Sequence, residues 1–264
     1  KPNSQVNLNT IDPNFIDEKE SYEHALPEIE AYNQKLNQLQ YLMYAENQRS
    51  LLICLQGRDA AGKDGTISHV LGAMNPRGCS VNHFCTPSNE ESAHNFLWRY
   101  EKVTPAKGEV AIFNRTHYED VLFPRVHHLV PEKVWSKRYR HINAFEERLY
   151  DNGTHILKFY LHIDEDEQLK RFEQRLVDPS RHWKISEWDY IERNHWDDYT
   201  LAYEVLLSKC STDYAPWFII PANHKWFRNL AISKIITEYL GSLKMEFPEP
   251  GIDLVEIAKK YHSS

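Results

Sequence analysis

A short glycine-rich segment offers the clearest chemistry in this sequence. The run SLLICLQG (50–57) is a continuous apolar stretch ended by glycine, the pattern of a strand buried on both faces. Directly after it, Gly57, Gly62 and Lys63 fit the spacing G-x-x-x-x-G-K, and a helix is expected to follow. A glycine-rich turn with a solvated lysine is the alternative. The strand and helix favour a phosphate-binding loop, because backbone N–H groups and a helix N-terminus bind phosphate oxygens and the lysine adds positive charge.

Two carboxylates distinguish this loop from the usual pattern. Asp64 stands where Ser or Thr normally follows the lysine to bind Mg²⁺, and Asp59 lies inside the loop. Carboxylates among phosphate-binding amides repel a polyanion unless Mg²⁺ bridges them, although Asp59 also fits a turn residue that hydrogen-bonds its own backbone. We therefore predict a loop built around metal as well as phosphate. Its expected phosphate-binding residues are Gly57, Arg58, Ala60, Ala61, Gly62, Lys63, Asp64, Gly65 and Thr66.

A second set of polar residues follows the predicted strand GEVAIFN (108–114). Asn114 ends this strand, and Arg115, Glu119 and Asp120 come just beyond it. In open parallel sheets ligands bind outside the carboxyl ends of the strands, so this segment is expected to face the phosphate loop. There Arg115 can bind a phosphate through two hydrogen bonds, and Asp120 or Glu119 can hold Mg²⁺ or accept a proton. An exposed charge or a helix cap is the alternative for each of these residues.

Two segments of the chain are rich in basic residues. Residues 124–141 and residues 170–184 each contain five Lys or Arg. The second segment includes a proline-containing irregular stretch between two predicted helices, where nucleotide kinases carry a lid that closes over the transferring phosphate. A solvated helix surface is the alternative, and we prefer it for Lys133, Lys137 and Lys170. The candidates for contact with a phosphate chain are Arg125, Arg138, Arg175, Arg181 and Lys184.

The elements that must position these residues alternate along the chain. A capping box at Ser88 and Glu91 predicts a helix through Tyr100, and helical periodicity also begins at about residue 27. Apolar runs predict five strands, at 50–57, 79–85, 108–114, 155–163 and 216–221. Strands that alternate with helices form βαβ units and hence a parallel sheet covered on both faces. We therefore predict an α/β fold of the P-loop kinase-like type: three layers, α/β/α, with a mainly parallel five-stranded sheet and a helical lid at about 175–195.

Composition and charge limit the classes of protein to which this chain can belong. The 264 residues include 31 Lys and Arg against 38 Asp and Glu, and the net charge of −7 argues against a nucleic-acid binder or a protein of anionic membranes. Residues 1–30 hold five of these seven excess negative charges, so the remaining chain is nearly neutral. No apolar run approaches the ~20 residues of a membrane span. The four cysteines lack CxxC spacing, which fits reduced thiols, and we expect a cytoplasmic protein with an N-terminal arm (1–26) and one domain (27–264).

The residues singled out above resemble those of a known family, the type-2 polyphosphate kinases, which move phosphate between inorganic polyphosphate and nucleotides. The resemblance rests on GRDAAGKDGT, FNRTHYEDVLFPRVH, INAFEERL, RLVDPSRHWKISEWD and YAPWFIIPANHKWFRNL, which together cover most of the chain from about 50 to 240. Asn114 is typical of the subgroup that accepts both nucleoside mono- and diphosphates, since two other subgroups have Asp there. The resemblance implies Mg²⁺-dependent transfer from polyphosphate to AMP and ADP, with GMP and GDP as further acceptors, by a dimer or tetramer.

The same resemblance implies a division of roles among the candidate residues. Lys63 and the loop amides would hold the phosphate at the transfer point, while Mg²⁺ on Asp59 and Asp120 would neutralise the donor and acceptor oxygens. Asp120 would also orient or deprotonate the acceptor, and the lid arginines would stabilise the phosphoryl group in transfer. The expected catalytic residues are Asp59, Lys63, Arg115, Asp120 and Arg175. The expected nucleotide-binding residues are Asn114, Arg115, Glu119 and Asp120.

Two other functions fit parts of the sequence. An ATP-dependent nucleoside monophosphate kinase of the thymidylate-kinase type shares the loop and the lid and differs in its phosphate donor. A P-loop regulatory module that binds nucleotide as a switch shares the loop, but the lid-like arginines and the Asp-rich loop count against it. Supplying polyphosphate and AMP without ATP separates these functions.

Overall fold

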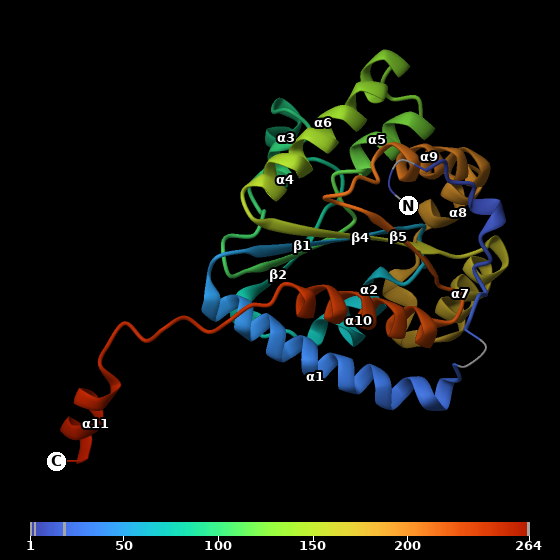
Figure 1. Ribbon diagram of the computed structural model, residues 1–264. Helices are drawn as coiled ribbons and strands as arrows, with labels where there is room; N and C mark the ends of the chain where they lie inside the picture. The colour runs from blue at the N-terminus through green and yellow to red at the C-terminus, as the bar shows by residue number, and fades with distance from the viewer. Residues whose placement is uncertain (1, 3, 18–19, 263–264) are drawn as a thin grey trace.

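A five-stranded parallel sheet forms the centre of the computed structural model, which describes residue 2 and residues 4–17 and 20–262 (Figure 1). The strands are β1 (Ser50–Gly57), β2 (Cys79–His83), β3 (Val110–Asn114), β4 (Thr154–His162) and β5 (Trp217–Pro221). Their order is β2-β3-β1-β4-β5, and every neighbouring pair is parallel. The predicted sheet is confirmed, and β1 with its loop lies at its centre.

Strand β1, at the centre of the sheet, is covered on both of its faces. All eight of its residues are buried. Leu51, Ile53 and Leu55 belong to one apolar cluster, whereas Leu52 and Cys54 belong to another on the opposite face. This alternation follows from the two-residue period of a strand. Burial on both faces explains why the sequence shows a continuous apolar run here.

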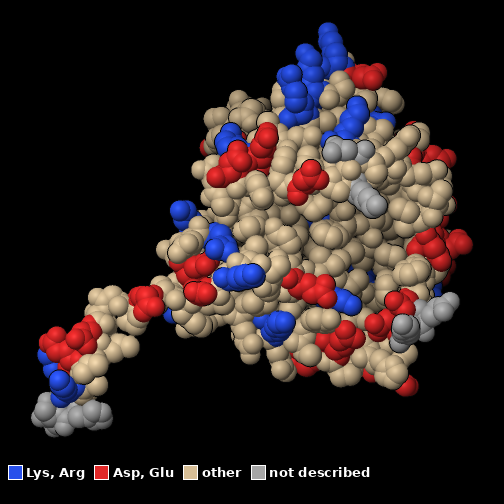
Figure 2. All heavy atoms as spheres, viewed as in Figure 1, with Lys and Arg blue, Asp and Glu red and all other residues tan. Residues whose placement is uncertain are grey.

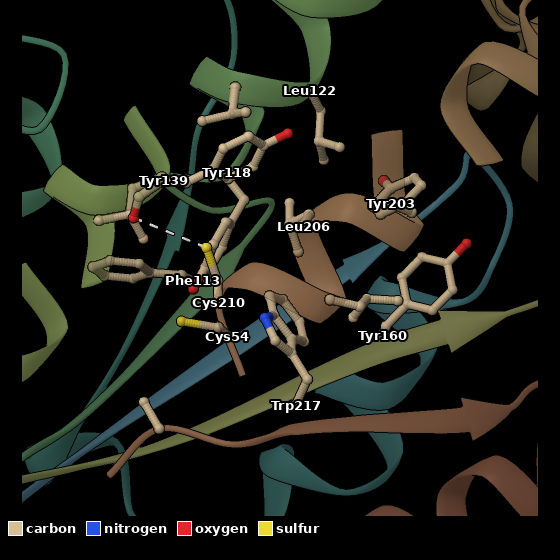
Figure 3. Packing of buried hydrophobic residues seen from close by; sticks show 14 of the residues in the cluster. Cys54, Phe113, Tyr118, Leu122, Tyr139, Tyr160, Tyr203, Leu206, Cys210 and Trp217 are labelled. Atoms are coloured by element: carbon tan, nitrogen blue, oxygen red, sulfur yellow. Dashed lines mark hydrogen bonds between the residues drawn. The ribbon is translucent and has the colours of Figure 1, made fainter. Parts of the chain in front are cut away.

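Helices cover the two faces of the sheet as separate layers (Figure 1). One layer consists of α1 (Tyr22–Glu46), α2 (Lys63–His69) and α10 (Lys225–Ser242). The other contains α3 (Asn89–Ala93), α4 (Trp98–Glu101), α5 (Glu119–Val126), α6 (Glu132–Asp151) and α9 (Trp196–Lys209). Figure 3 shows the core of the second layer, where Tyr118, Leu206 and Trp217 pack together. The predicted α/β/α architecture is confirmed.

Three local predictions differ from the structure. Helix α1 begins at Tyr22, because Ser21 Oγ accepts a hydrogen bond from the N–H of His24, so the predicted boundary at 26/27 falls inside a helix. The helix expected through Tyr100 is divided into α3 and α4, because the backbone leaves the helical conformation at His94. Strand β2 ends at His83, before the expected Cys85.

The N-terminal segment lies along the domain surface. The N–H of Leu8 donates to Glu204 Oε1 of α9 at 2.8 Å, and the Leu8 side chain is buried. His162 Nε2, at the end of β4, hydrogen-bonds the carbonyl of Ile11 at 3.1 Å. The predicted arm is therefore attached to the body of the domain.

Two segments lie at opposite ends of the strands (Figure 1). At the carboxyl ends, α7 (Glu165–Val177) leads into a 3₁₀ turn (Pro179–Lys184) and α8 (Glu187–Arg193), which occupy the predicted lid region. At the other end, the chain after α10 runs away from the domain and finishes in α11 (Leu254–His262). Within the described ranges, no helix is long and apolar enough to span a membrane.

Candidate functional site

The loop between β1 and α2 has the backbone that phosphate binding requires. Gly62 caps α2 in the left-handed region with a φ of 111°, a conformation that favours glycine. Lys63 begins the helix, and its buried Nζ donates to the carbonyls of Gly57 at 2.7 Å and Arg58 at 3.1 Å. Burial and the nearby Arg115 lower the pKa of Lys63 despite the opposing effect of surrounding carboxylates. The ammonium group is thus held over the loop whose N–H groups would bind a phosphate.

Two buried arginines support this loop from α7 and α10. Arg171 Nη1 donates to the carbonyls of Ala60 at 2.8 Å and Ala61 at 3.0 Å. Arg228 lies so close that a Cβ built on Gly62 would be 1.8 Å from its Nη1. Burial, together with the charge of Arg171, lowers the pKa of Arg228 to about 10. Neither arginine was predicted as a site residue, although YAPWFIIPANHKWFRNL, which contains Arg228, is one of the segments that carry the family resemblance.

The carboxylates of the loop contact cations from β3 and from the lid. Asp59 Oδ1 accepts a hydrogen bond from Arg115 Nη2 at 2.6 Å. Asp64 accepts from Asn114 Nδ2 at 3.0 Å and from Lys184 Nζ at 3.1 Å. Burial raises the pKa of Asp64, but these two hydrogen bonds outweigh it and leave the pKa below its usual value. The segment after β3 and the lid both therefore reach the phosphate loop.

The lid is held by a second ion pair. Arg175 Nη1 donates to Asp189 Oδ2 at 2.7 Å, which links the end of α7 to α8. Burial and the charge of Asp59 raise the pKa of Asp189 despite the presence of Arg175. Arg181 lies further out, where its Nε contacts Asp178 at 2.8 Å. The lid thus presents three of its predicted basic side chains, Arg175, Arg181 and Lys184, toward the same space.

That space is an open cavity of about 900 Å³ at the carboxyl ends of β1 and β3. The predicted site residues that line it are Asp59, Ala60, Gly62, Lys63, Asp64, Gly65, Asn114, Arg115, Arg175, Arg181 and Lys184. Its lining also includes residues that sequence reasoning missed as site residues, namely Arg171, Asp189, Lys225, Trp226 and Arg228. The side chain of Arg58 turns away from the cavity, donates to the carbonyl of Trp196 at 2.7 Å and stacks on its ring. The cavity extends from the lid to the first turns of α1 and α10.

Neighbouring carboxylates of α5 have different surroundings. Asp120 accepts from Tyr100 Oη at 2.6 Å and Arg99 Nη2 at 2.9 Å, and it is not among the residues that line the cavity. Arg99 and Tyr100 thus engage the Asp120 carboxylate, and the sharing of a metal by Asp120 and Asp59 stays a prediction. The charge of Glu119, in contrast, reaches Lys63 and contributes to the pKa of that lysine. Neither carboxylate is among the residues that line the cavity, although the charge of Glu119 raises the pKa of Lys63.

Two predicted phosphate contacts, Arg125 and Arg138, lie between α5 and α6. Arg125 Nη1 donates to Tyr139 Oη at 3.1 Å. Arg138 donates to the carbonyl of Asp120 and lies over the ring of Phe96. Neither is among the residues that line the cavity, and contact of these two arginines with a phosphate chain stays a prediction. Figure 2 shows further Lys and Arg side chains gathered at the top of the molecule, where α6 begins.

Oxygen atoms in the cavity suit Mg²⁺. Asp59 and Asp64 supply carboxylates, and the buried Oδ1 of Asn114 has no hydrogen-bond partner. The described residues contain no group of three or more His, Cys, Asp or Glu that could hold a metal ion. Mg²⁺ is commonly held by one or two carboxylates together with substrate phosphates and water. The residues present therefore fit Mg²⁺ that is shared with a phosphate substrate.

A phosphate loop, a basic lid and a parallel sheet with this strand order define a phosphotransferase of the P-loop kinase type. A sequence profile of the family described as polyphosphate kinase 2 matches residues 17–248. The chain belongs to the polyphosphate kinase 2 family, and the predicted resemblance is confirmed.

Individual relatives are similar to this chain over almost its whole length. The AMP/ADP-polyphosphate phosphotransferase of Meiothermus ruber is 47% identical over 251 residues, which cover 95% of this chain and 94% of the relative. The ADP-polyphosphate phosphotransferase of Rhodopseudomonas palustris is 44% identical, with coverages of 90% and 86%. The crystal structure of polyphosphate kinase 2 from Arthrobacter aurescens superposes with a TM-score of 0.96 at 41% identity and covers 99% of this chain and 94% of its own.

Proposed function

We propose that this protein transfers phosphoryl groups from inorganic polyphosphate to AMP and ADP. The observation that carries this proposal is the cavity in which the phosphate loop and the lid cations face Asn114 and Arg115 at the end of β3. Family membership confirms a polyphosphate-dependent phosphotransferase over an ATP-dependent nucleoside monophosphate kinase. The acceptor range is drawn from the relative that acts on both AMP and ADP.

Phosphoryl transfer depends on positioning and on charge stabilisation, and the site offers groups for both. Lys63 and the loop N–H groups would bind the phosphate that is transferred, and Arg115 would bind a phosphate of the acceptor. Arg175 from the lid would stabilise the charge that develops on the transferring group. We assign the orientation of the acceptor to Glu119, whose charge raises the pKa of Lys63, since Arg99 and Tyr100 engage the carboxylate of Asp120.

Mg²⁺ would be held by Asp59 and Asp64, with the free Oδ1 of Asn114 as a further oxygen ligand. When bound, the ion would neutralise charge on the phosphate oxygens of donor and acceptor. A strong base is unnecessary, since the acceptor is itself a phosphate with a second pKa of about 6.

The first expected result is nucleotide synthesis without ATP. The protein mixed with long-chain polyphosphate, Mg²⁺ and AMP should form ADP and then ATP. Anion-exchange chromatography measures both products over time. Excess EDTA should reduce the rate by at least about 100-fold, since the carboxylates then repel the polyanion. Phosphorylation of AMP by ATP alone would contradict the proposed donor. Tight nucleotide binding without turnover, from either donor, would indicate a switch module instead.

A second expected result concerns the acceptor range. In Asn114→Asp, a carboxylate replaces the amide that donates to Asp64 at 3.0 Å, so two negative charges meet where the acceptor phosphate would bind. The ratio of kcat/KM for AMP to that for ADP should change by about 5-fold or more, because the two acceptors differ in charge. Asn229→Asp adds the same charge to the same cavity on α10 and should leave the ratio unchanged. An unchanged ratio in Asn114→Asp would refute this role for Asn114.

Further parts of the proposal concern partners and location. We propose GMP and GDP as additional acceptors, a dimer or tetramer in solution, and a cytoplasmic location. The four cysteines are free thiols, which suits a reducing compartment. Light scattering coupled to size-exclusion chromatography measures the oligomeric state directly.

A further inference from the structure

Arg115 has an unusual backbone conformation that its successors hold in place. Its φ is 58°, in the left-handed region that residues other than glycine rarely adopt. The next three residues, Thr116, His117 and Tyr118, are completely buried. Thr116 Oγ1 accepts from Gln56 Nε2 at 3.1 Å, and Gln56 directly precedes the first glycine of the phosphate loop. The direction of the Arg115 side chain is therefore set by buried anchors on its C-terminal side.

His117 and Tyr118 are anchored by an ion pair in the core. Glu146 of α6 and Lys158 of β4 are both fully buried, and Lys158 Nζ lies 2.6 Å from Glu146 Oε2. Glu146 Oε1 accepts from Tyr118 Oη at 2.6 Å and pairs with His117 Nε2 at 3.0 Å. Lys158 Nζ also donates to Tyr118 Oη at 2.8 Å and to the carbonyl of Cys210 at 2.6 Å. All three N–H bonds of the lysine are used, and they join β4, α6, α9 and the segment after β3.

The protonation of this network follows from its surroundings. Burial raises the pKa of Glu146, but Lys158 and His117 outweigh it and leave the pKa below its usual value. The carboxylate is therefore ionised and only accepts hydrogen bonds, so Nε2 of His117 must carry the proton. Burial lowers the pKa of His117, which keeps the ring neutral at neutral pH despite the adjacent carboxylate.

A buried ion pair of this kind is weak evidence for a role in stability. Removing two charges from water costs several kcal/mol per ion, and apolar residues of similar volume often serve the fold equally well. Tyr118, the residue that the pair holds, lies in the apolar cluster with Leu206, Cys210 and Trp217, where neutral packing would suffice (Figure 3). The hydrogen bonds, in contrast, have a direction that apolar contacts lack. They fix the two residues that immediately follow the Arg115–Thr116 turn.

We infer that Glu146 and Lys158 are positioning residues, which keep Arg115 in its left-handed conformation and aim its guanidinium at the acceptor phosphate. This inference rests on the proposed role of Arg115 in binding the acceptor. It assigns a role to Glu146, which lies in the INAFEERL motif, a part of the sequence that the phosphate site itself does not use. It also explains how an arginine whose Nη2 reaches Asp59 at 2.6 Å can keep its direction although a loop carries it.

A double-mutant cycle tests whether the pair acts through Arg115. Glu146→Leu with Lys158→Met removes both charges together, so that neither is left buried and unpaired. In the native background it should lower kcat/KM for AMP by about 10- to 100-fold, because a small misplacement of a substrate-binding group costs this much. In an Arg115→Ala background the same pair of changes should cost less than about 3-fold, since the group that it positions is gone. The KM for AMP should rise more than the KM for polyphosphate.

Two matched variants separate positioning from general damage to the core. Glu146→Gln with Lys158→Met keeps an oxygen that accepts from His117 and Tyr118, and it should recover activity to within about 3-fold of the native enzyme. Ser50→Ala with Thr154→Val removes a buried hydrogen bond of 2.9 Å from the opposite end of β1 and β4, and it should leave the KM for AMP unchanged. Should the variant Glu146→Leu with Lys158→Met not fold, Tyr118→Phe removes one anchor and should raise the KM for AMP by about 3-fold through Arg115 alone.

Equal losses in the native and Arg115→Ala backgrounds would overturn the inference, as would failure of the Gln/Met variant to recover activity. Both outcomes differ from failure of the proposed function, in which the unaltered protein would form no ADP from polyphosphate and AMP. An unaltered KM for AMP in Arg115→Ala would remove the proposed role of Arg115 and the inference with it.

Discussion

Replacing Lys63 by alanine should lower kcat for polyphosphate-dependent ADP formation by about 1,000-fold. The buried ammonium lies over the loop, 2.7 Å from the carbonyl of Gly57, and contributes a charge that a neutral side chain cannot supply. Because Lys63 is buried, water screens its charge less than that of a solvated lysine, which strengthens its attraction for the transferring phosphoryl group. Steady-state kinetics at saturating polyphosphate and AMP measure the loss, and circular dichroism shows whether the fold is retained.

Lys225→Ala is the matched control for this change. Lys225 lines the same cavity at the start of α10 but does not belong to the loop. Its loss should raise the KM for polyphosphate and lower kcat by less than about 10-fold, since it would attract the chain without touching the transferred group. If Lys63→Ala kept more than a tenth of the native kcat, the loop could not be the point of transfer.

Gly62→Ala should disable the same loop by a different route. A Cβ at this position would lie 1.8 Å from Arg228 Nη1, and the φ of 111° is strained for any L side chain. The displaced guanidinium would lose its place beside the loop, so activity should fall by about 100-fold. The free energy of unfolding should fall by about 1–3 kcal/mol, measured as a lower Tm by differential scanning calorimetry.

Two further variants divide this effect into its causes. Gly241→Ala makes the same chemical change in α10, where no heavy atom other than the neighbouring backbone of the helix lies within 4 Å of the new Cβ, and it should leave activity unchanged and Tm equal or higher. Gly62→Ala with Arg228→Ala removes the overlap but keeps the strained φ. If this double variant regains part of the Tm that Gly62→Ala loses, the remaining loss is due to the strained backbone. A Gly62→Ala enzyme as active as Gly241→Ala would show that the loop tolerates a side chain.

The sequence predicted those parts of the molecule whose signals are contiguous. A strand buried on both faces must be apolar throughout, so 50–57 was predicted to the residue, and the glycines and lysine that follow have few other uses at that spacing. Helix ends were less predictable. Ser21 caps α1 upstream of Pro27, and a proline inside a helix is normally a sign of its start.

Side-chain direction was the main obstacle at the site. Glu119 and Asp120 are adjacent on α5, and successive residues of a helix point about 100° apart, so the two carboxylates meet different neighbours. No pattern in the sequence indicates which neighbours each carboxylate meets. Arg99 and Tyr100, which engage Asp120, lie about twenty residues upstream and meet it only through the fold.

Buried charges outside the phosphate-loop motif were not predictable. Arg228, Glu146 and Lys158 resemble the solvated charges found on most helices and strand edges, and their burial depends on partners far away in the chain. Such residues become recognisable only when the fold brings the partner carbonyls and carboxylates to them.

The ion pairs of the cavity have a consequence for a protein whose net charge is −7 but whose substrate is a polyanion. Arg115, Arg175 and Lys184 each hold a carboxylate of the protein itself, and these carboxylates act as built-in counterions. A phosphate chain that enters releases its own bound cations, but the carboxylates that it displaces stay nearby and take cations up, so the net release of ions is smaller. Its affinity therefore depends less steeply on salt concentration than the number of basic side chains would suggest, in contrast to proteins that hold nucleic acids in an unpaired basic groove.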